Sequence, residues 1–153
     1  MIYILIIFIL LLVETMIKSY FDSNWEQGKK KPILKGKIIL NKRYNKGMML
    51  NFMEDKKDLV KKLTSIALGI ILLVFLFFLP KKNMKLEKLA LSLCLAGGIS
   101  NLSDRFIRGQ VVDYFTINFR KLKRVVFNLA DIFIFLGAII LLVASIFKGE
   151  KLD

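Results

Sequence analysis

Residues 125–147 read VVFNLADIFIFLGAIILLVASIF, and this stretch decides the class of fold. Apart from Asn128, Asp131 and Ser145, it contains only apolar residues and glycine. An α-helix needs about 20 residues to cross the hydrocarbon core of a bilayer, at about 1.5 Å of rise per residue. The stretch therefore predicts a membrane-spanning helix.

Three further segments have the character of membrane spans, at residues 1–20, 61–80 and 85–102. The first of them has no basic region before its apolar run and no small-residue cleavage site after it. We therefore expect a retained span rather than a cleaved signal peptide. An uncleaved anchor with no other role is the alternative.

The composition agrees with a membrane protein and excludes several other classes. The 153 residues are 56% hydrophobic, with 25 Lys and Arg against 12 Asp and Glu, whereas disordered chains have low hydrophobicity. One cysteine, Cys94, cannot form a disulfide scaffold, and the lack of histidine removes the usual residue of zinc, haem and Ser-His-Asp sites. We expect no nucleic-acid partner, because Trp25 and Tyr44 are too few aromatics for a basic binding face.

Between the first two spans, residues 30–55 contain short apolar runs bounded by Gly and Asn, a pattern typical of short strands joined by turns. The predicted fold is an all-α membrane protein, a four-transmembrane-helix bundle with a small β-sheet cradle between the first and second helices. The whole chain, residues 1–153, forms one domain in this interpretation.

Ionisable residues inside spans cost about 2.5–3.5 kcal/mol on insertion scales, so they usually face the bundle interior and have a partner. Glu14 and Lys18 are four residues apart on one helix face, which favours a structural ion pair. Asp104 follows Asn101 by three residues, and Asp131 follows Asn128 by three. Taken singly, Asn128 could be a helix cap, and Asp104 could mark the water boundary.

Taken together, Asp104 and Asp131 lie at the facing ends of two adjacent spans, at similar depth. Two nearby carboxyls in a low-dielectric site cannot both ionise comfortably, so one keeps its proton. The ionised carboxylate can then activate water, while the protonated partner hydrogen-bonds a scissile carbonyl and later protonates the leaving amine. This pair predicts amide hydrolysis without a metal or another cofactor.

Three blocks of the C-terminal half resemble the motifs of the bacterial lipoprotein signal peptidase (signal peptidase II) family. They read NLSDR at residues 101–105, GQVVDY at residues 109–114 and FNLAD at residues 127–131. The resemblance implies a four-span aspartic protease that cleaves the signal peptide from diacylglyceryl-modified prolipoproteins. It further implies lipid-modified signal peptides and membrane lipids as partners, no cofactor, and a monomer.

The resemblance also implies a role for each site residue. Asp104 and Asp131 would be the catalytic dyad, and Asp113 would brace the site with Glu14 and Lys18. The residues that would bind substrate or shape the site are Asn45, Gly47, Asn101, Arg105, Asn128 and Ala130.

The N-terminal half departs from the family pattern. The motif Asp-x-x-(Thr/Ser)-Lys becomes ETMIK at residues 14–18, and Asn-x-Gly-Ala-Ala-Phe becomes NKGMML at residues 45–50. Ser100 stands where the family usually has Gly. We expect these changes, which include Met48 and Met49, to affect substrate fit more than chemistry.

The charge distribution opposes the family's topology. The resemblance implies a multi-pass protein of the bacterial cytoplasmic membrane, with both termini inside and the active site toward the extracytoplasmic face. Yet the first and third connections hold most of the Lys and Arg, which normally accumulate in the cytoplasm. We follow the family, because a basic sheet can lie on anionic lipid headgroups at about 1 kcal/mol per residue.

Two alternatives stay open on the sequence alone. A non-catalytic relative that binds lipoprotein precursors is favoured by the altered N-terminal motifs. A small proton-coupled carrier is suggested by carboxylates within spans. Four spans without an inverted repeat are few for alternating access.

Overall fold

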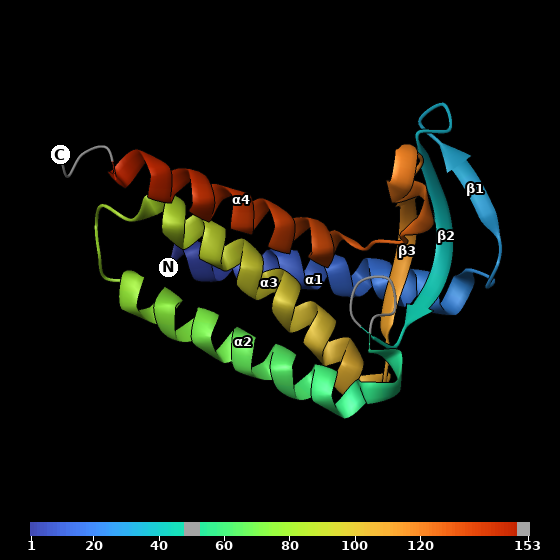
Figure 1. Cartoon of the computed structure of the whole chain (residues 1–153), viewed down its shortest axis with the longest axis horizontal. Coiled ribbons are helices and arrows are strands. Elements are labelled where there is room, and N and C mark those ends of the chain that lie inside the picture. Colours follow the sequence, from blue (N-terminus) through green and yellow to red (C-terminus); the bar gives the residue numbers. More distant parts are fainter. Residues whose placement is uncertain (48–52, 150–153) are drawn as a thin grey trace.

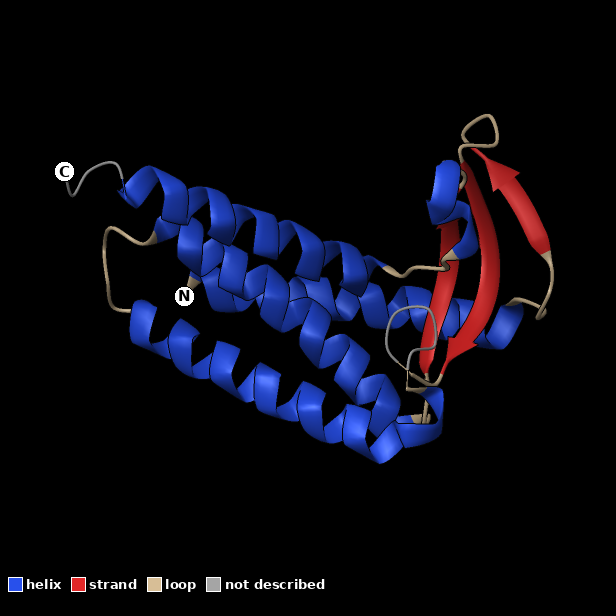
Figure 2. Ribbon diagram, in the orientation of Figure 1, coloured by secondary structure: helices blue, strands red, loops and turns tan. Residues whose placement is uncertain are grey.

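The structure, a computed structural model, describes residues 1–47 and 53–149. A bundle of long helices has a sheet across one end (Figures 1 and 2). The helices are α1 (Ile2–Asn24), α2 (Lys57–Phe78), α3 (Lys85–Ile107) and α4 (Leu129–Gly149). The sheet contains β1 (Lys30–Ile33), β2 (Ile38–Asn45) and β3 (Val111–Ile117), and the 3-10 helices are η2 (Glu54–Lys56) and η3 (Arg120–Arg124).

Helix α3 lies at the centre of the bundle and contacts α1, α2 and α4. Among the described residues, three helical segments are long and apolar enough to cross a membrane: Ile2–Asn24, Glu54–Phe78 and Leu129–Phe147. Helix α3 is less apolar and buries charged side chains, including Glu87, Lys88 and Asp104. The other helices cover much of its surface.

Helices α3 and α4 touch at glycines. A Cβ added to Gly97 would lie 2.3 Å from the carbonyl oxygen of Ala130, and one added to Gly137 would lie 2.6 Å from that of Ala90. Only hydrogen atoms fit at these two contacts. The first contact holds the start of α4 against α3, close to the predicted site residues.

The sheet is antiparallel in the order β1-β2-β3, and only two of its strands come from the predicted cradle region. The third, β3, comes from the connection between α3 and α4, so a cradle formed by residues 30–55 alone was an incomplete prediction. The reason is that β2 needs a partner on its second edge, and the buried run of β3 supplies it. Met48 and Met49 lie outside the described residues.

An aromatic cluster fixes the sheet to the end of α1. Phe21 of α1 stacks on Tyr114 of β3 with ring centroids 4.8 Å apart, and both side chains are buried with Val112 and Phe115. Figure 1 shows the sheet at the end of the bundle away from both chain termini. This packing holds Asp113, between Val112 and Tyr114, near the start of α4.

Candidate active site

Helix α4 begins with a reciprocal pair of hydrogen bonds. The backbone N–H of Asp131 donates to Oδ1 of Asn128 at 2.9 Å, and the backbone N–H of Asn128 donates to Oδ2 of Asp131 at 3.1 Å. This is a capping box, in which each side chain satisfies an otherwise unpaired amide. The alternative interpretation of Asn128 as a helix cap is therefore confirmed, and the cap also fixes the carboxyl of Asp131.

The next two amides of α4 are also satisfied by side chains. Leu129 N–H donates to the Tyr114 hydroxyl oxygen at 3.0 Å, and Ala130 N–H donates to Oε1 of Glu14 at 3.3 Å. The Tyr114 hydroxyl in turn donates to Oε2 of Glu14 at 2.7 Å. Glu14 thus joins α1, β3 and α4 at one buried point.

Lys18 is buried beside Glu14, and the predicted ion pair is present at 3.7 Å. Its ammonium group also donates to Ser100 Oγ at 3.0 Å and Asn101 Oδ1 at 2.9 Å, and lies 2.9 Å from Oδ2 of Asp104. A buried ammonium group needs such partners, because desolvation is costly. Lys18 therefore fixes the end of α3 against α1.

Asp104 is held by two cations. Besides Lys18, its carboxylate pairs with Arg108 one helical turn later, and it accepts the Val112 backbone N–H at 3.3 Å. These contacts engage both carboxylate oxygens. The geometry is that of a structural ion pair connecting α1, α3 and β3.

Asp113 is almost fully buried and has neutral partners. Its Oδ1 accepts from Asn128 Nδ2 at 2.7 Å, and its Oδ2 accepts from Asn45 Nδ2 at 3.2 Å. Burial, followed by the nearby charge of Asp131, raises the pKa of Asp113 from 3.8 to about 8. Asp113 therefore retains its proton at neutral pH.

A cavity of about 580 Å³ lies where β3, η3 and the first turns of α4 meet α3. Its polar lining residues are few, and the rest of the wall is apolar. The polar ones are Asn45, Asn101, Arg105, Asp113 and Asp131. The apolar ones include Ile117, Leu122, Val125, Val126, Phe127, Ile132 and Phe135.

The carboxyl that shares this cavity with Asp131 is Asp113, and Asp104 is not among the described residues that line it. The structure thus does not support the predicted pairing of Asp104 with Asp131. Asp104 turns toward Lys18 and Arg108, whereas β3 returns Asp113 to the start of α4. Asn128 bonds to both Asp113 and Asp131, so it connects the two carboxyls that face the cavity.

The other predicted site residues surround this pair. Asn101 donates to Asp131 Oδ1 at 2.9 Å, and Arg105 donates to the carbonyl oxygens of Asn101 at 3.1 Å and Gly47 at 2.9 Å. Within the described part of the chain, Nε of Arg105 is the buried side-chain polar atom that lacks a partner. Asn45 lies at the cavity wall, and Ala130 contributes its backbone amide.

Three residues in this network were not predicted from the sequence. Arg108 pairs with Asp104, Tyr114 connects Glu14 to α4, and Ser100 binds Lys18. The four-residue spacing of Asp104 and Arg108 was the available signal for the first, because it puts both on one helix face. Tyr114 and Ser100 had no comparable spacing signal.

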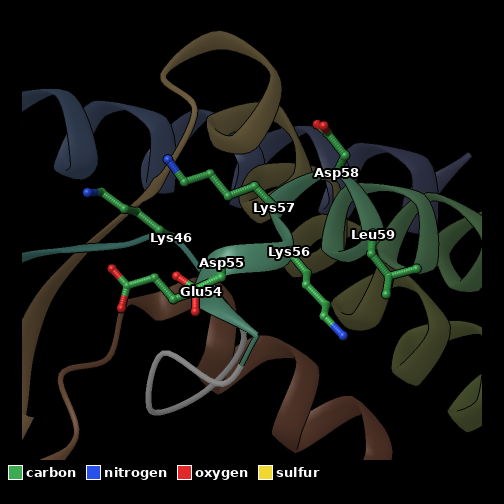
Figure 3. Close-up of a pocket in the computed structure, with 7 residues that line it drawn as sticks. All are labelled: Lys46, Glu54, Asp55, Lys56, Lys57, Asp58 and Leu59. Carbon is green, nitrogen blue, oxygen red and sulfur yellow. The ribbon is translucent and has the colours of Figure 1, made fainter.

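A second cavity of about 460 Å³ lies at the surface beside η2 (Figure 3). Charged side chains dominate its lining: Lys46, Glu54, Asp55, Lys56, Lys57 and Asp58. Figure 3 shows that they point in different directions, with Lys56 and Asp58 turned away from Lys46. Three of these side chains are carboxylates and three are lysines.

The family model described as signal peptidase (SPase) II matches residues 6–147, nearly the whole chain. The chain belongs to the signal peptidase II family. A curated lipoprotein signal peptidase of Fusobacterium nucleatum subsp. nucleatum is 34% identical over 155 aligned residues, which cover 99% of this chain and 90% of the relative.

Two solved structures of bacterial membrane enzymes share the fold. The first has a TM-score of 0.84 at 22% identity, and the alignment covers 99% of this chain and 91% of the solved chain. The second has a TM-score of 0.77 at 24% identity, and the alignment covers 94% of this chain and 91% of the solved chain. The bundle with a sheet at one end is thus the arrangement of known membrane enzymes.

Two departures from the signal peptidase II motifs have structural reasons in this chain. Glu14, where the resemblance has Asp, reaches both Tyr114 and the Ala130 amide of α4. Ser100, where it has Gly, accepts a hydrogen bond from Lys18. In this signal peptidase II chain, both replacements therefore provide hydrogen-bond partners for buried polar groups.

Proposed function

We propose that this protein is a membrane aspartic endopeptidase that removes signal peptides from diacylglyceryl-modified prolipoproteins. The observation that carries the proposal is the pair of carboxyls, Asp113 and Asp131, on one apolar cavity. We replace the dyad predicted from the sequence by this pair. Family membership and the lipoprotein signal peptidase relative support the substrate class.

The environments of the two carboxyls suggest different roles. Asp113 keeps its proton at neutral pH because its pKa is raised to about 8. Asp131 accepts two hydrogen bonds at the start of α4, where the helix dipole favours negative charge. We therefore assign Asp131 as the base that takes a proton from water and Asp113 as the acid.

The proposed reaction follows from these roles. Asp131 takes a proton from water, and the water oxygen attacks the carbonyl carbon of the scissile amide. Asp113 donates its proton to the carbonyl oxygen, which becomes a hydroxyl in the tetrahedral intermediate. The proton held by Asp131 then passes to the leaving nitrogen, the C–N bond breaks, and the hydroxyl proton returns to Asp113.

We further propose that all four long helices cross the bilayer and that the cavity lies at the extracytoplasmic face of the bacterial cytoplasmic membrane. Helix α3 can cross despite its charged residues, because Glu87, Lys88 and Asp104 are buried. The apolar cavity wall continues along α4 through Ile132 and Phe135, and the Phe135 side chain is 65% exposed. A signal peptide can therefore enter sideways from the lipid.

The test is a gel-shift assay on a lipid-modified prolipoprotein with purified wild type, Asp113→Asn and Asp131→Asn. Losing an acid or a base typically costs about 10²- to 10⁴-fold, so we expect cleavage to fall by at least that lower factor in each variant. The matched control is Asp58→Asn, because Asp58 has an exposed side chain and does not line the cavity.

Retained cleavage in either dyad variant would reject the proposed mechanism. Binding of the precursor without cleavage by wild type would favour the non-catalytic relative instead. Circular dichroism of each variant must show unchanged helix content, so that loss of activity is separated from loss of fold.

A further inference from the structure

A second feature of the surface lies outside the cavity. The described segments 29–45 and 114–128 together contain eleven Lys and Arg and no Asp or Glu. Exposed basic side chains gather at the β1–β2 turn and on η3, with exposed apolar side chains between them. We call this region the basic corner; its members are Leu34, Lys35, Lys37, Phe119, Arg120, Lys121, Leu122, Lys123 and Arg124.

The two parts of the basic corner are joined by hydrogen bonds. Asn118, just before η3, donates its backbone N–H to the Lys37 carbonyl at 2.8 Å and its side-chain amide to the Gly36 carbonyl at 3.0 Å. The turn itself is tight, with positive φ at Leu34, Lys35 and Gly36. Turn and η3 therefore present their charges as one surface.

The basic corner lies beside the point where α4 begins. Only residues 125–128 separate η3 from α4, and a chain spans at most about 3.6 Å per residue, so the five steps from Arg124 to Leu129 put Arg124 within roughly 18 Å of that point. Figure 1 shows the turn and η3 extending past the side of α4. When the apolar helices of the bundle lie in a bilayer, the basic corner faces the lipid headgroups.

The chemistry of the basic corner matches an anionic lipid surface. Phe119 is 59% exposed, with the Arg120 guanidinium 5.3 Å from its ring, and Leu34 is 66% exposed at the turn. Phe and Leu side chains beside basic residues insert at the boundary of headgroups and acyl chains, and the basic residues there gain about 1 kcal/mol each from anionic lipids. We propose that the basic corner binds the headgroups of anionic phospholipids and seats this end of the protein on the bilayer.

This contact does not depend on the proposed peptidase activity. It can be measured with a polarity-sensitive fluorophore on Leu34→Cys in a Cys94→Ala background, in lipid nanodiscs with increasing phosphatidylglycerol in phosphatidylcholine. We expect emission to shift to shorter wavelength as the anionic fraction rises. The shift should disappear at about 1 M salt, where the Debye length falls to about 3 Å.

A triple variant removes charge from the basic corner: Lys35→Gln, Lys37→Gln and Lys121→Gln. At about five-fold per residue, the preference for anionic over zwitterionic lipid should fall roughly 100-fold. The matched control removes three lysines at the opposite end of the bundle: Lys81→Gln, Lys82→Gln and Lys85→Gln. That variant should respond like the wild type.

A charge-preserving variant with Arg at the same three basic-corner positions should keep the response, which excludes a mere folding defect. An emission wavelength that does not change with the phosphatidylglycerol fraction would overturn the proposal. So would a triple Gln variant that responds like its control. Because the readout is fluorescence, neither result bears on cleavage.

Discussion

Asn128 performs two tasks with one amide side chain. Its Oδ1 caps α4 through the Asp131 N–H, and its Nδ2 donates to Asp113. The same residue thus begins a helix and connects the two carboxyls of the proposed dyad. Because Asn128 is fully buried, each of these bonds lies in a low-dielectric setting where an unpaired polar group is costly.

The raised pKa of Asp113 predicts a pH dependence of cleavage. Activity needs the protonated carboxyl, so the rate should fall as pH rises through about 8. The Asn45 hydrogen bond lowers the pKa of Asp113, so Asn45→Ala should move this alkaline limb to higher pH. A pH–rate profile from pH 5 to pH 10 checks both. If the alkaline limb of the Asn45→Ala profile lies at the same pH as that of the wild type, the assignment of Asp113 as the acid is contradicted.

The same shift has a consequence for stability. An unfolded Asp113 loses its proton near its ordinary pKa of 3.8, whereas the folded one keeps it to about 8. This stabilising contribution is complete below pH 3.8 and is lost as pH rises toward 8. The melting temperature of the wild type should therefore fall over this pH range by more than the melting temperature of Asp113→Asn.

Asp104 should behave as a structural residue. Asp104→Asn removes the counter-charge that Lys18 and Arg108 share, while Lys18 keeps Glu14 and Arg108 keeps Asp22. Because breaking a fully buried pair costs about 3–5 kcal/mol, we expect a smaller loss here. We expect a lower melting temperature, with activity per folded molecule far above that of Asp131→Asn. Loss of all activity in an intact Asp104→Asn fold would restore the dyad predicted from the sequence.

At the scale of elements, the contact between α3 and α4 positions the start of α4, which carries Asp131 of the proposed dyad. The α4 backbone approaches α3 at Gly97 so closely that a methyl group cannot fit without movement. The contacting atom is the carbonyl oxygen of Ala130, next to Asp131. The packing of α3 against α4 therefore affects the position of Asp131.

Gly97→Ala should reduce both stability and cleavage, because overpacking costs typically 1–3 kcal/mol and would displace the start of α4. The matched control is Gly69→Ala on α2, where an added Cβ meets nothing within 4 Å. Melting temperature and cleavage rate of the two variants, measured in the same detergent, test this. Equal behaviour of the two would show that the contact is not limiting.

Tyr114→Phe should also weaken the start of α4. It removes the hydroxyl that donates to Glu14 and accepts from Leu129, and unsatisfied buried groups cost about 1–3 kcal/mol. Tyr20→Phe is the control, because the Tyr20 side chain is 55% exposed. Thermal unfolding should separate the two variants, and identical curves would contradict the importance of this bond.

At the scale of the whole molecule, the proposed topology places the sheet outside and the turn between α2 and α3 inside. Single cysteines at Lys30 and at Lys82, in a Cys94→Ala background, should react with a membrane-impermeant maleimide in intact cells at the first position only. The positive-inside preference predicts the reverse. Labelling at Lys82 with protection at Lys30 would invert the topology.

The helices could be predicted from the sequence because lipid-facing residues must be apolar, so long apolar runs report them directly. The position of β3 was harder to predict, since its partner β2 lies about 70 residues earlier and a short apolar run does not distinguish strand from helix. The choice between Asp104 and Asp113 depends on the turn after α3. There Gly109, with φ +71°, helps to turn the chain back toward α4.

The cavity wall that continues along α4 has a kinetic consequence. The rate at which the enzyme meets a peptide that arrives through the lipid depends on the mole fraction of the peptide in the bilayer. It does not depend on the concentration of the peptide in the surrounding water. Adding inert lipid at constant enzyme and substrate should therefore slow turnover by dilution in two dimensions, although no bulk concentration changes.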